Sequence, residues 1–170
     1  MSDRQRYLVA LGSNMRHAAY GSPRKVLEAA FAALGEGGDV VLARSPILRS
    51  APLGPSKREY CNAAALVETA LAPDAYMAQL LEIEERFGRK RRGGEWRSRV
   101  LDLDIVLWNA GAWASDDGEL AVIVPHPSFR ERDFVLRPAV SIAGDWRDPL
   151  SGLTTRHLSA RLTKPRHRPR

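Results

Sequence analysis

The chain has 170 residues, of which 44% are hydrophobic and 27% are charged. This composition is typical of a globular protein, and a chain of this length can bury its own core within a single domain. One cysteine, Cys61, excludes an internal disulfide, and no apolar run approaches the roughly 20 residues that cross a bilayer. The N-terminus does not read as a secretory signal, so we expect a cytoplasmic protein without membrane partners.

The formal net charge of +6 is concentrated at one end of the chain. Residues 161–170 contain five basic residues and no acid, and the rest of the chain carries a net charge of only +1. We therefore expect one domain over 1–163 and a basic, disordered tail over 164–170. A solubilising tail explains this charge better than a nucleic-acid-binding arm, so we do not expect nucleic acid as a partner.

The predicted elements of the first half are a strand, a helix and two further strands. Alternating apolar residues over 7–11 predict a strand that ends at the turn Gly12-Ser13-Asn14. Ser22 followed by Pro23 predicts a helix start, and Gly35 predicts its end. Next come a strand over 40–43 that continues toward residue 48, a Pro- and Gly-containing loop over 49–60 and a strand over 62–69.

A second helix, from Pro73 to Gly88, opens the other half. Glu84 lies on the apolar face of this helix, together with Leu80 and Leu81. The remaining predictions are a basic loop over 89–99, a strand over 100–107, a turn over 109–118, a short strand over 120–124 and helical stretches near 133–143 and 154–162.

The order β-α-β-β-α-β predicts an α+β fold, a ferredoxin-like split βαβ sandwich with an antiparallel sheet and an extra strand and helices. Enzymes, regulatory domains and RNA-binding modules all use this architecture, so the function depends on the residues of the site.

The segment Leu101–Leu107 places two acids on one face of a predicted strand. Because side chains alternate along a strand, Asp102 and Asp104 share one face, and Leu101, Leu103, Ile105 and Leu107 share the other. Neighbouring carboxylates repel each other unless a cation lies between them, and Mg²⁺ prefers such oxygen ligands. The alternative is a solvated face with two incidental acids.

The loop that precedes these acids is strongly basic. Its basic residues, with the end of the helix before it, are Arg86, Arg89, Lys90, Arg91, Arg92, Arg97 and Arg99. Such a loop alone is more often solvated or bound to nucleic acid, but next to a carboxylate pair it favours a metal–polyphosphate site. The chain has no G-x-x-x-x-G-K-[ST] phosphate loop, so arginines and metal would hold the phosphates.

Further candidates have two readings each. Glu84 either pairs with a nearby arginine or contacts a bound nucleotide, and His126, flanked by prolines, either donates to a phosphate or caps a turn. A flat heterocycle needs aromatic faces and an amide in its plane, although each such residue alone is also compatible with packing. The candidates are Tyr60, Asn62, Trp96 and Phe134.

Together these motifs resemble the pyrophosphokinases of folate synthesis over residues 7–160. The motifs that carry the resemblance are Leu11-Gly12-Ser13-Asn14, Tyr60-x-Asn62-Ala63, Gly88-Arg89, Trp96-x-x-Arg99-x-Leu101-Asp102-Leu103-Asp104, Val124-Pro125-His126-Pro127 and Arg132-x-Phe134-x-Leu136-x-Pro138. The resemblance implies transfer of pyrophosphate from ATP to the hydroxymethyl group of 6-hydroxymethyl-7,8-dihydropterin, with release of AMP. It also implies a ferredoxin-like fold, small-molecule substrates and, as we expect, a monomer.

The resemblance also implies the roles of individual residues. Two Mg²⁺ ions would bind to Asp102 and Asp104. ATP would contact Glu84, Arg89, Arg91, Arg99, His126 and Arg132. The pterin would contact Ser50, Leu53, Tyr60, Asn62, Trp96 and Phe134. The residues closest to catalysis would be Arg89, Trp96, Arg99, Asp102 and Asp104.

The chain departs from the family pattern at two positions. Arg97-Ser98 stands where the family usually has Gly-Pro, and Pro127 stands where some members have an aromatic residue. Two other functions fit the same residues: a non-catalytic ferredoxin-like module that binds RNA or a small ligand, and a different ATP-dependent transferase.

Overall fold

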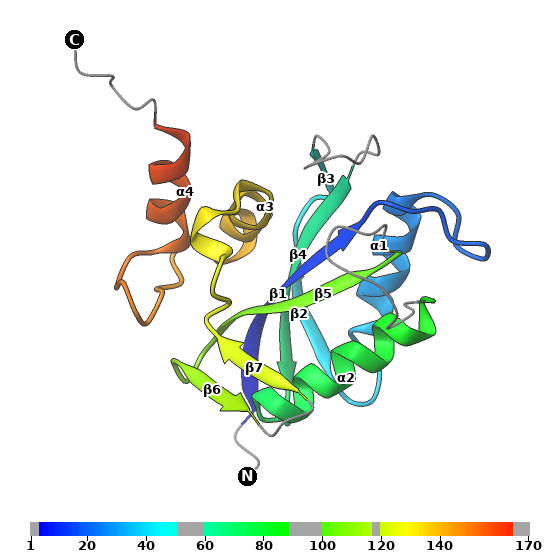
Figure 1. Cartoon of the computed structure of the whole chain (residues 1–170), viewed down its shortest axis with the longest axis horizontal. Helices are drawn as coiled ribbons and strands as arrows, with labels where there is room; N and C mark the ends of the chain where they lie inside the picture. Colours follow the sequence, from blue (N-terminus) through cyan, green and yellow to red (C-terminus); the bar gives the residue numbers. More distant parts are fainter. Residues whose placement is uncertain (1–3, 51–59, 89–99, 117–119, 165–170) are drawn as a thin grey trace.

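The structure is a computed structural model that describes residues 4–50, 60–88, 100–116 and 120–164 (Figure 1). Its first half contains two helices, α1 and α2, separated by three strands, and its described elements end with two helices. In chain order they are β1 (Gln5–Ser13), α1 (Pro23–Ala33), β2 (Val40–Arg44), β3 (Leu48–Ser50), β4 (Tyr60–Thr69), α2 (Pro73–Arg86), β5 (Asp102–Trp108), β6 (Trp113–Asp116), β7 (Ala121–Val124), a 3-10 turn over Phe129–Glu131, α3 (Asp133–Ala143) and α4 (Thr155–Thr163).

One antiparallel sheet forms the centre of the described structure. Its strand order is β2-β4-β1-β5, with the short β3 also paired to β4. Strand β4 therefore lies between β2 and β1, so that each β-α-β unit is split by a strand from the other unit. This order confirms the predicted ferredoxin-like fold. Strands β6 and β7 form a separate hairpin.

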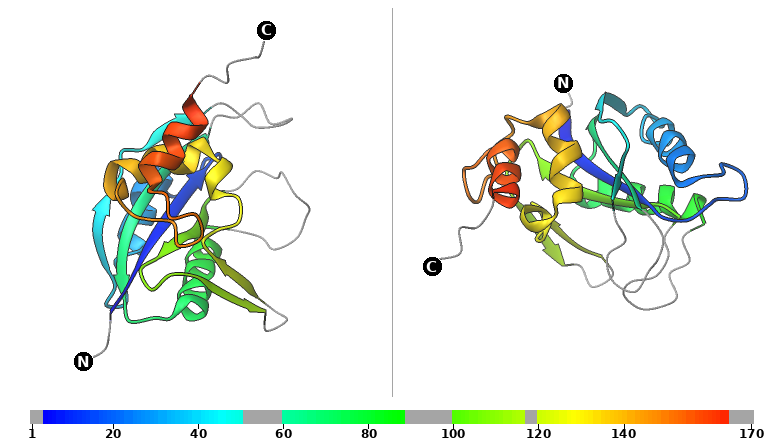
Figure 2. Two further views of the ribbon diagram at one scale, coloured as in Figure 1. Left: turned by 90° about the vertical axis from the view of Figure 1, so that its left-hand side faces the viewer. Right: turned by 90° about the horizontal axis from the view of Figure 1, so that it is seen from above.

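Helices cover both faces of the sheet. Figures 1 and 2 show α1 and α2 on one side and α3 and α4 on the other. The first layer buries Tyr7, Val9 and Leu11 of β1 against α1 and α2, and the second buries Leu8 of β1 against α3 and α4. Successive residues of β1 thus enter opposite cores, as the alternation of strand side chains requires.

The helix boundaries follow the predicted signals. Pro23 begins α1, and the Oγ of Ser22 accepts a hydrogen bond from the backbone N–H of Lys25 at 3.5 Å. After α2, Gly88 has a φ of 90°, a left-handed conformation that glycine adopts without steric cost. In the part of the chain that the structure describes, no helix combines the length and hydropathy needed to cross a membrane.

Three local predictions were wrong. The strand expected to run from residue 40 toward 48 is two strands, because β2 ends at Arg44 and β3 occupies the beginning of the predicted loop. The predicted turn over 109–118 contains β6, whose alternation of half-buried and exposed residues is short and includes an acid. Both errors arise because strands of three or four residues give too few positions for a periodic signal.

The third error concerns the face of Leu107. The register between β1 and β5 shifts between Leu8 and Val9, which pair with Leu107 and Ile105. A β-bulge of this kind adds one residue to a strand and reverses the alternation beyond it. Leu107 therefore packs in the core under α3, whereas Leu103 and Ile105 pack in the core under α1 and α2.

Candidate active site

The centre of the site is a row of three residues across three strands. Gly12 of β1 pairs with Asn62 of β4 on one side and with Asp102 of β5 on the other. A Cβ atom on Gly12 would lie 3.6 Å from Oδ1 of Asn62 and 4.0 Å from Cβ of Asp102. The three residues thus face the same side of the sheet, and the missing side chain of Gly12 leaves space between an amide and a carboxylate.

The predicted carboxylate pair lies on this face. Asp102 and Asp104 are half-buried, whereas Leu101 and Leu103 are 1% exposed in the opposite core. The alternation that predicted one face for both acids therefore holds on this part of β5, before the bulge. Asp104 pairs with Ala10, so small residues of β1 lie beside both acids.

The chemistry of these donors fits Mg²⁺. Carboxylate oxygens are the ligands that Mg²⁺ accepts, and this ion usually keeps water or phosphate oxygens in its remaining positions. Within residues 4–50, 60–88, 100–116 and 120–164, no group of three or more His, Cys, Asp or Glu side chains is placed to hold a metal. Asp102 and Asp104 would supply part of the coordination of such an ion, and phosphate oxygens or water would supply the rest.

His126 lies directly beside the acids. Its backbone N–H donates to the carbonyl of Val106 in β5 at 3.0 Å, and its Nε2 lies 3.9 Å from Oδ2 of Asp104. Nδ1 accepts from the backbone N–H of Ser128 at 3.1 Å, which assigns the proton of the neutral ring to Nε2. Burial lowers the pKa of His126 below its ordinary value, Arg132 lowers it further, and Asp104 and Asp102 oppose these effects. At neutral pH the imidazole presents an N–H to the space beside Asp104.

The beginning of α3 supplies another side of the site. The carbonyl of Arg132 accepts from the backbone N–H groups of Val135 and Leu136 at 3.0 Å, which fixes Arg132 at the start of the helix. Its guanidinium carbon lies 5.9 Å from the ring centroid of Phe134, within the range of a cation–π contact. The predicted phosphate-binding arginine and the predicted stacking aromatic are therefore neighbours.

A cavity of about 230 Å³ lies between β3, β4 and α3. It is lined by Leu48, Arg49, Ser50, Asn62, Asp133, Phe134 and Arg137. The structure thus brings together three of the predicted pterin-binding residues: Ser50, Asn62 and Phe134. Nδ2 of Asn62 donates to Oγ of Ser50 at 2.7 Å, which leaves Oδ1 of Asn62 directed toward Gly12.

Tyr60 is half-buried at the first position of β4 and pairs with Ser50. Two residues before Asn62 on the same strand, it faces the same side of the sheet, although it does not line the cavity among the described residues. Leu53, Arg89, Arg91, Trp96 and Arg99 lie outside the described residues, and their roles stay predictions.

Glu84 has a structural partner on β5. Its side chain is 0% exposed, and its Oε1 accepts from the backbone N–H of Leu103 at 2.6 Å. This bond joins α2 to the strand between the two aspartates, so Glu84 helps to fix the position of the acids from the opposite face. The predicted nucleotide contact of Glu84 stays a prediction.

Several residues of the cavity were not identified from the sequence. Leu48 and Arg49 fell in the predicted strand end and loop, and Asp133 and Arg137 were assigned only to a helix. Asp133 and Arg137 are four positions apart on α3, and Nη1 of Arg137 lies 3.8 Å from Oδ2 of Asp133. An acid at a helix start with a basic residue four positions later is a pattern that the sequence alone could have shown. Gly12 was predicted as a turn residue and as part of the motif Leu11-Gly12-Ser13-Asn14, without a role in the site.

Comparison with known proteins identifies similar sequences. Residues 8–144 match the family model of 7,8-dihydro-6-hydroxymethylpterin-pyrophosphokinase. The 2-amino-4-hydroxy-6-hydroxymethyldihydropteridine pyrophosphokinase of Haemophilus influenzae is 34% identical over 149 residues, which are 86% of this chain and 87% of that protein. The Synechocystis enzyme of the same name is 39% identical over 106 residues, 62% of this chain and 52% of its own length.

Solved structures support the fold. The crystal structure of Plasmodium falciparum HPPK-DHPS wild type with SDX-DHP matches with a TM-score of 0.74 at 12% identity, covering 94% of this chain and 44% of that chain. The chain thus spans about half the length of the Synechocystis relative and less than half of the Plasmodium chain.

Proposed function

The chain belongs to the 7,8-dihydro-6-hydroxymethylpterin-pyrophosphokinase family of ATP-dependent diphosphotransferases, and on this premise we propose that it transfers pyrophosphate from ATP to the hydroxymethyl group of 6-hydroxymethyl-7,8-dihydropterin and releases AMP. The observation that supports this most is the row Asp102–Gly12–Asn62. An amide suited to the pterin and a carboxylate suited to a metal flank one residue without a side chain. Because neighbouring strands are about 4.8 Å apart, the two groups lie about 10 Å apart across the sheet, a distance that one pterin and its reacting alcohol can span.

The pterin is recognised in the cavity between β3 and α3. Oδ1 of Asn62 accepts from the N–H groups of the ring, because its Nδ2 is already held by Ser50. The ring lies against Phe134 of the same cavity, and Tyr60 covers the other face. Leu53 and Trp96 complete this set as the family pattern implies.

The triphosphate lies over Asp102 and Asp104. Two Mg²⁺ ions held by these carboxylates would neutralise charge on the phosphates. The guanidinium group of Arg132 and the Nε2–H of His126 donate to phosphate oxygens, and the backbone N–H of Ser128 holds the imidazole in this orientation through Nδ1. Arg89, Arg91 and Arg99 add further charge, and the family pattern implies a nucleotide contact for Glu84.

The chain's residues assist transfer by placing the alcohol in line with the β-phosphorus. Asn62 and Phe134 orient the pterin, and Arg132 and His126 hold the phosphates in the geometry of attack. Asp102 acts as a metal ligand rather than a strong base, because a metal-bound carboxylate binds protons poorly. We further propose one domain over 1–163, a solvated tail over 164–170, a monomer and a cytoplasmic location.

The direct test is the identity of the nucleotide product. Purified protein is incubated with ATP, Mg²⁺ and 6-hydroxymethyl-7,8-dihydropterin, and nucleotides are separated by chromatography. AMP in equal amount to pyrophosphorylated pterin supports the proposal. ADP would identify a simple kinase, and the absence of any product, with the protein folded, would reject transfer in favour of a binding module.

A further inference from the structure

The segment between His126 and Arg132 is held by an ion pair whose carboxylate is fully buried. Arg130, in the 3-10 turn Phe129–Glu131, donates from Nε and Nη2 to Oδ2 and Oδ1 of Asp148, both at 2.7 Å. Both donors and both acceptors lie in a parallel fork, the strong geometry of an arginine–carboxylate pair. The side chain of Asp148 is 0% exposed, and that of Arg130 is 26% exposed.

Asp148 is itself fixed by its own turn. Oδ2 accepts from Oγ of Ser151 at 2.5 Å, and Oδ1 accepts from the backbone N–H of Leu150 at 3.1 Å. Its backbone N–H donates to the carbonyl of Leu153 at 2.9 Å, and its carbonyl accepts from Gly152 at 2.8 Å. The carboxylate is therefore a rigid acceptor before Arg130 binds to it.

The other side of the pair connects to the site through short backbone hydrogen bonds. The N–H of Phe129 donates to the carbonyl of His126 at 3.2 Å, and the N–H of Arg132 donates to the carbonyl of Phe129 at 3.3 Å. Phe129 is 0% exposed, and the guanidinium carbon of Arg130 lies 4.7 Å from its ring centroid. A displacement of Arg130 would therefore move His126 and Arg132 together.

We propose that Asp148 and Arg130 form a brace that positions His126 beside Asp104 and Arg132 at the start of α3. Asp148 lies beyond residue 144, where the match to the family model ends. The turn before α4 thus supplies part of the support for a site whose residues lie in the matched region. This inference rests on the proposed function, because it takes His126 and Arg132 as phosphate-binding residues.

The brace predicts a larger effect on nucleotide binding than on pterin binding. Arg130 and Asp148 do not line the cavity of Ser50, Asn62 and Phe134. Loss of the brace should therefore weaken the binding of ATP more than the binding of the pterin. A merely structural role would reduce the amount of active protein and so lower kcat without changing either KM.

The test compares D148N with D145N. Asp145 lies in the same turn, is 92% exposed and pairs with Arg156 at 3.4 Å, so the same change removes an exposed ion pair instead of a buried one. The affinity for a non-hydrolysable ATP analogue with Mg²⁺ is measured by calorimetry, and KM is measured for ATP and for the pterin. Circular dichroism selects a temperature at which every variant is folded.

In D148N we expect about tenfold weaker binding of the analogue and about tenfold higher KM for ATP, with the KM for the pterin within twofold, since small displacements of positioning groups have effects of this size. D145N should match the wild type. R130K keeps the positive charge but loses the two parallel hydrogen bonds, so its affinity for the analogue should lie between those of D148N and D145N. This variant replaces D148N in the test if D148N does not fold.

Folded D148N or R130K with wild-type affinity for the analogue would overturn the brace, as would an equal rise in both KM values. Failure of the proposed function is a different result, because the wild type would then form no AMP. The brace would still be tested by binding of the analogue to wild type and variants.

Discussion

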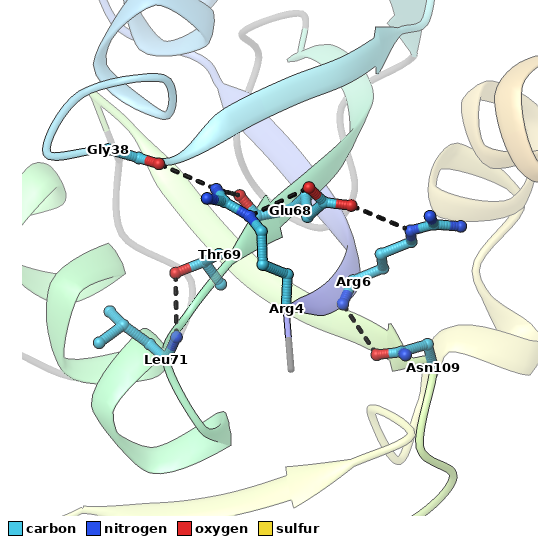
Figure 3. Close-up of polar contacts among 7 residues, drawn as sticks. All are labelled: Arg4, Arg6, Gly38, Glu68, Thr69, Leu71 and Asn109. Carbon is cyan, nitrogen blue, oxygen red and sulfur yellow. Dashed lines mark hydrogen bonds and ion pairs between the residues drawn. The ribbon is translucent and has the colours of Figure 1, made fainter. Parts of the chain in front are cut away.

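The two ends of strands β1 and β4 use carboxylates in opposite ways. At one end, Glu68 lies between two arginines: its Oε1 is 3.0 Å from Nε of Arg4, and its Oε2 is 3.3 Å from Nε of Arg6 (Figure 3). At the other end, Asp102 and Asp104 lie side by side on one face, next to Gly12 and the ring of His126. The same sheet thus neutralises one acid with its own cations and gathers two others.

This contrast indicates which carboxylates of a small sheet are candidates for function. A carboxylate that two guanidinium groups hold across a strand pair contributes to stability, and only modestly when the arginines are exposed. Two carboxylates that share a face repel each other, and the fold keeps them there with a buried Glu84 bond behind the strand. Our proposal accounts for this arrangement by a divalent cation that binds to both acids during function.

The largest expected effect is at the acidic end. Asp102→Asn or Asp104→Asn should lower kcat/KM by more than about a hundredfold, because each change removes a charge that holds the metal and phosphates. Steady-state formation of AMP measures this effect. Wild-type turnover in either folded variant would remove the metal assignment.

The next effect is at Gly12. In Gly12→Ala the new methyl group would meet Asn62 and Asp102 at ordinary contact distances of 3.6 and 4.0 Å, so the variant should fold. The methyl group would occupy the space between the pterin and metal groups, and we expect kcat/KM to fall by about tenfold or more.

Gly35→Ala is the matched control. Its added methyl group would meet the carbonyl of Ala32 at 3.6 Å and Val41 at 3.7 Å, which is nearly the same space at the far end of α1. This variant should keep wild-type activity. Equal activity in the Gly12 and Gly35 variants would show that the space above Gly12 is not used.

Asp148 is paired with an arginine, as Glu68 is, but its side chain is fully buried. Its arginine and hydroxyl partners hold the pKa of Asp148 at about 2, below the ordinary 3.8. A lowered pKa stabilises the fold at pH above about 4, and this stability is lost as the pH falls toward 2. The shift corresponds to about 2 kcal/mol.

Urea unfolding at pH 7 and at pH 3 measures this contribution. Asp148→Asn should lose about 2 kcal/mol or more at pH 7 and should show a weaker dependence on pH below 4 than the wild type. An equal decrease in the free energy of unfolding from pH 7 to pH 3 in the variant and the wild type would contradict a lowered pKa of Asp148.

The smallest effect is at Glu68. Glu68→Gln should reduce the free energy of unfolding by about 1 kcal/mol or less, because both arginines are exposed. It should leave the formation of AMP unchanged, since Glu68 lies at the opposite end of β1 and β4 from Asn62. A loss of activity comparable to that of Asp104→Asn would break the distinction between the two ends.

The sequence predicted the elements whose signals are long or chemically sharp. Ser22-Pro23 and Gly88 marked helix ends, and the alternation around Asp102 and Asp104 assigned both acids to one face. The order of elements then predicted the sheet. These features depend on residues that are close in the chain, so local patterns contain the necessary information.

Other features depend on pairing between distant residues. The bulge that turns Leu107 to the other face is a property of the register between β1 and β5. The space above Gly12 exists only because Asn62 and Asp102 come to either side of it, and the contact of Arg130 with Asp148 joins residues 18 positions apart. No periodic signal in the chain reports such contacts.

The proposed function requires that Asp102 and Asp104 together bind divalent ions that hold a nucleotide. The most direct measurement is a Mn²⁺ titration followed by electron paramagnetic resonance, in the presence of a non-hydrolysable ATP analogue. The wild type and Glu68→Gln should bind the ion equally, and the double variant Asp102→Asn/Asp104→Asn should lose the protein-dependent sites. Undiminished Mn²⁺ binding in the folded double variant would contradict metal binding by Asp102 and Asp104.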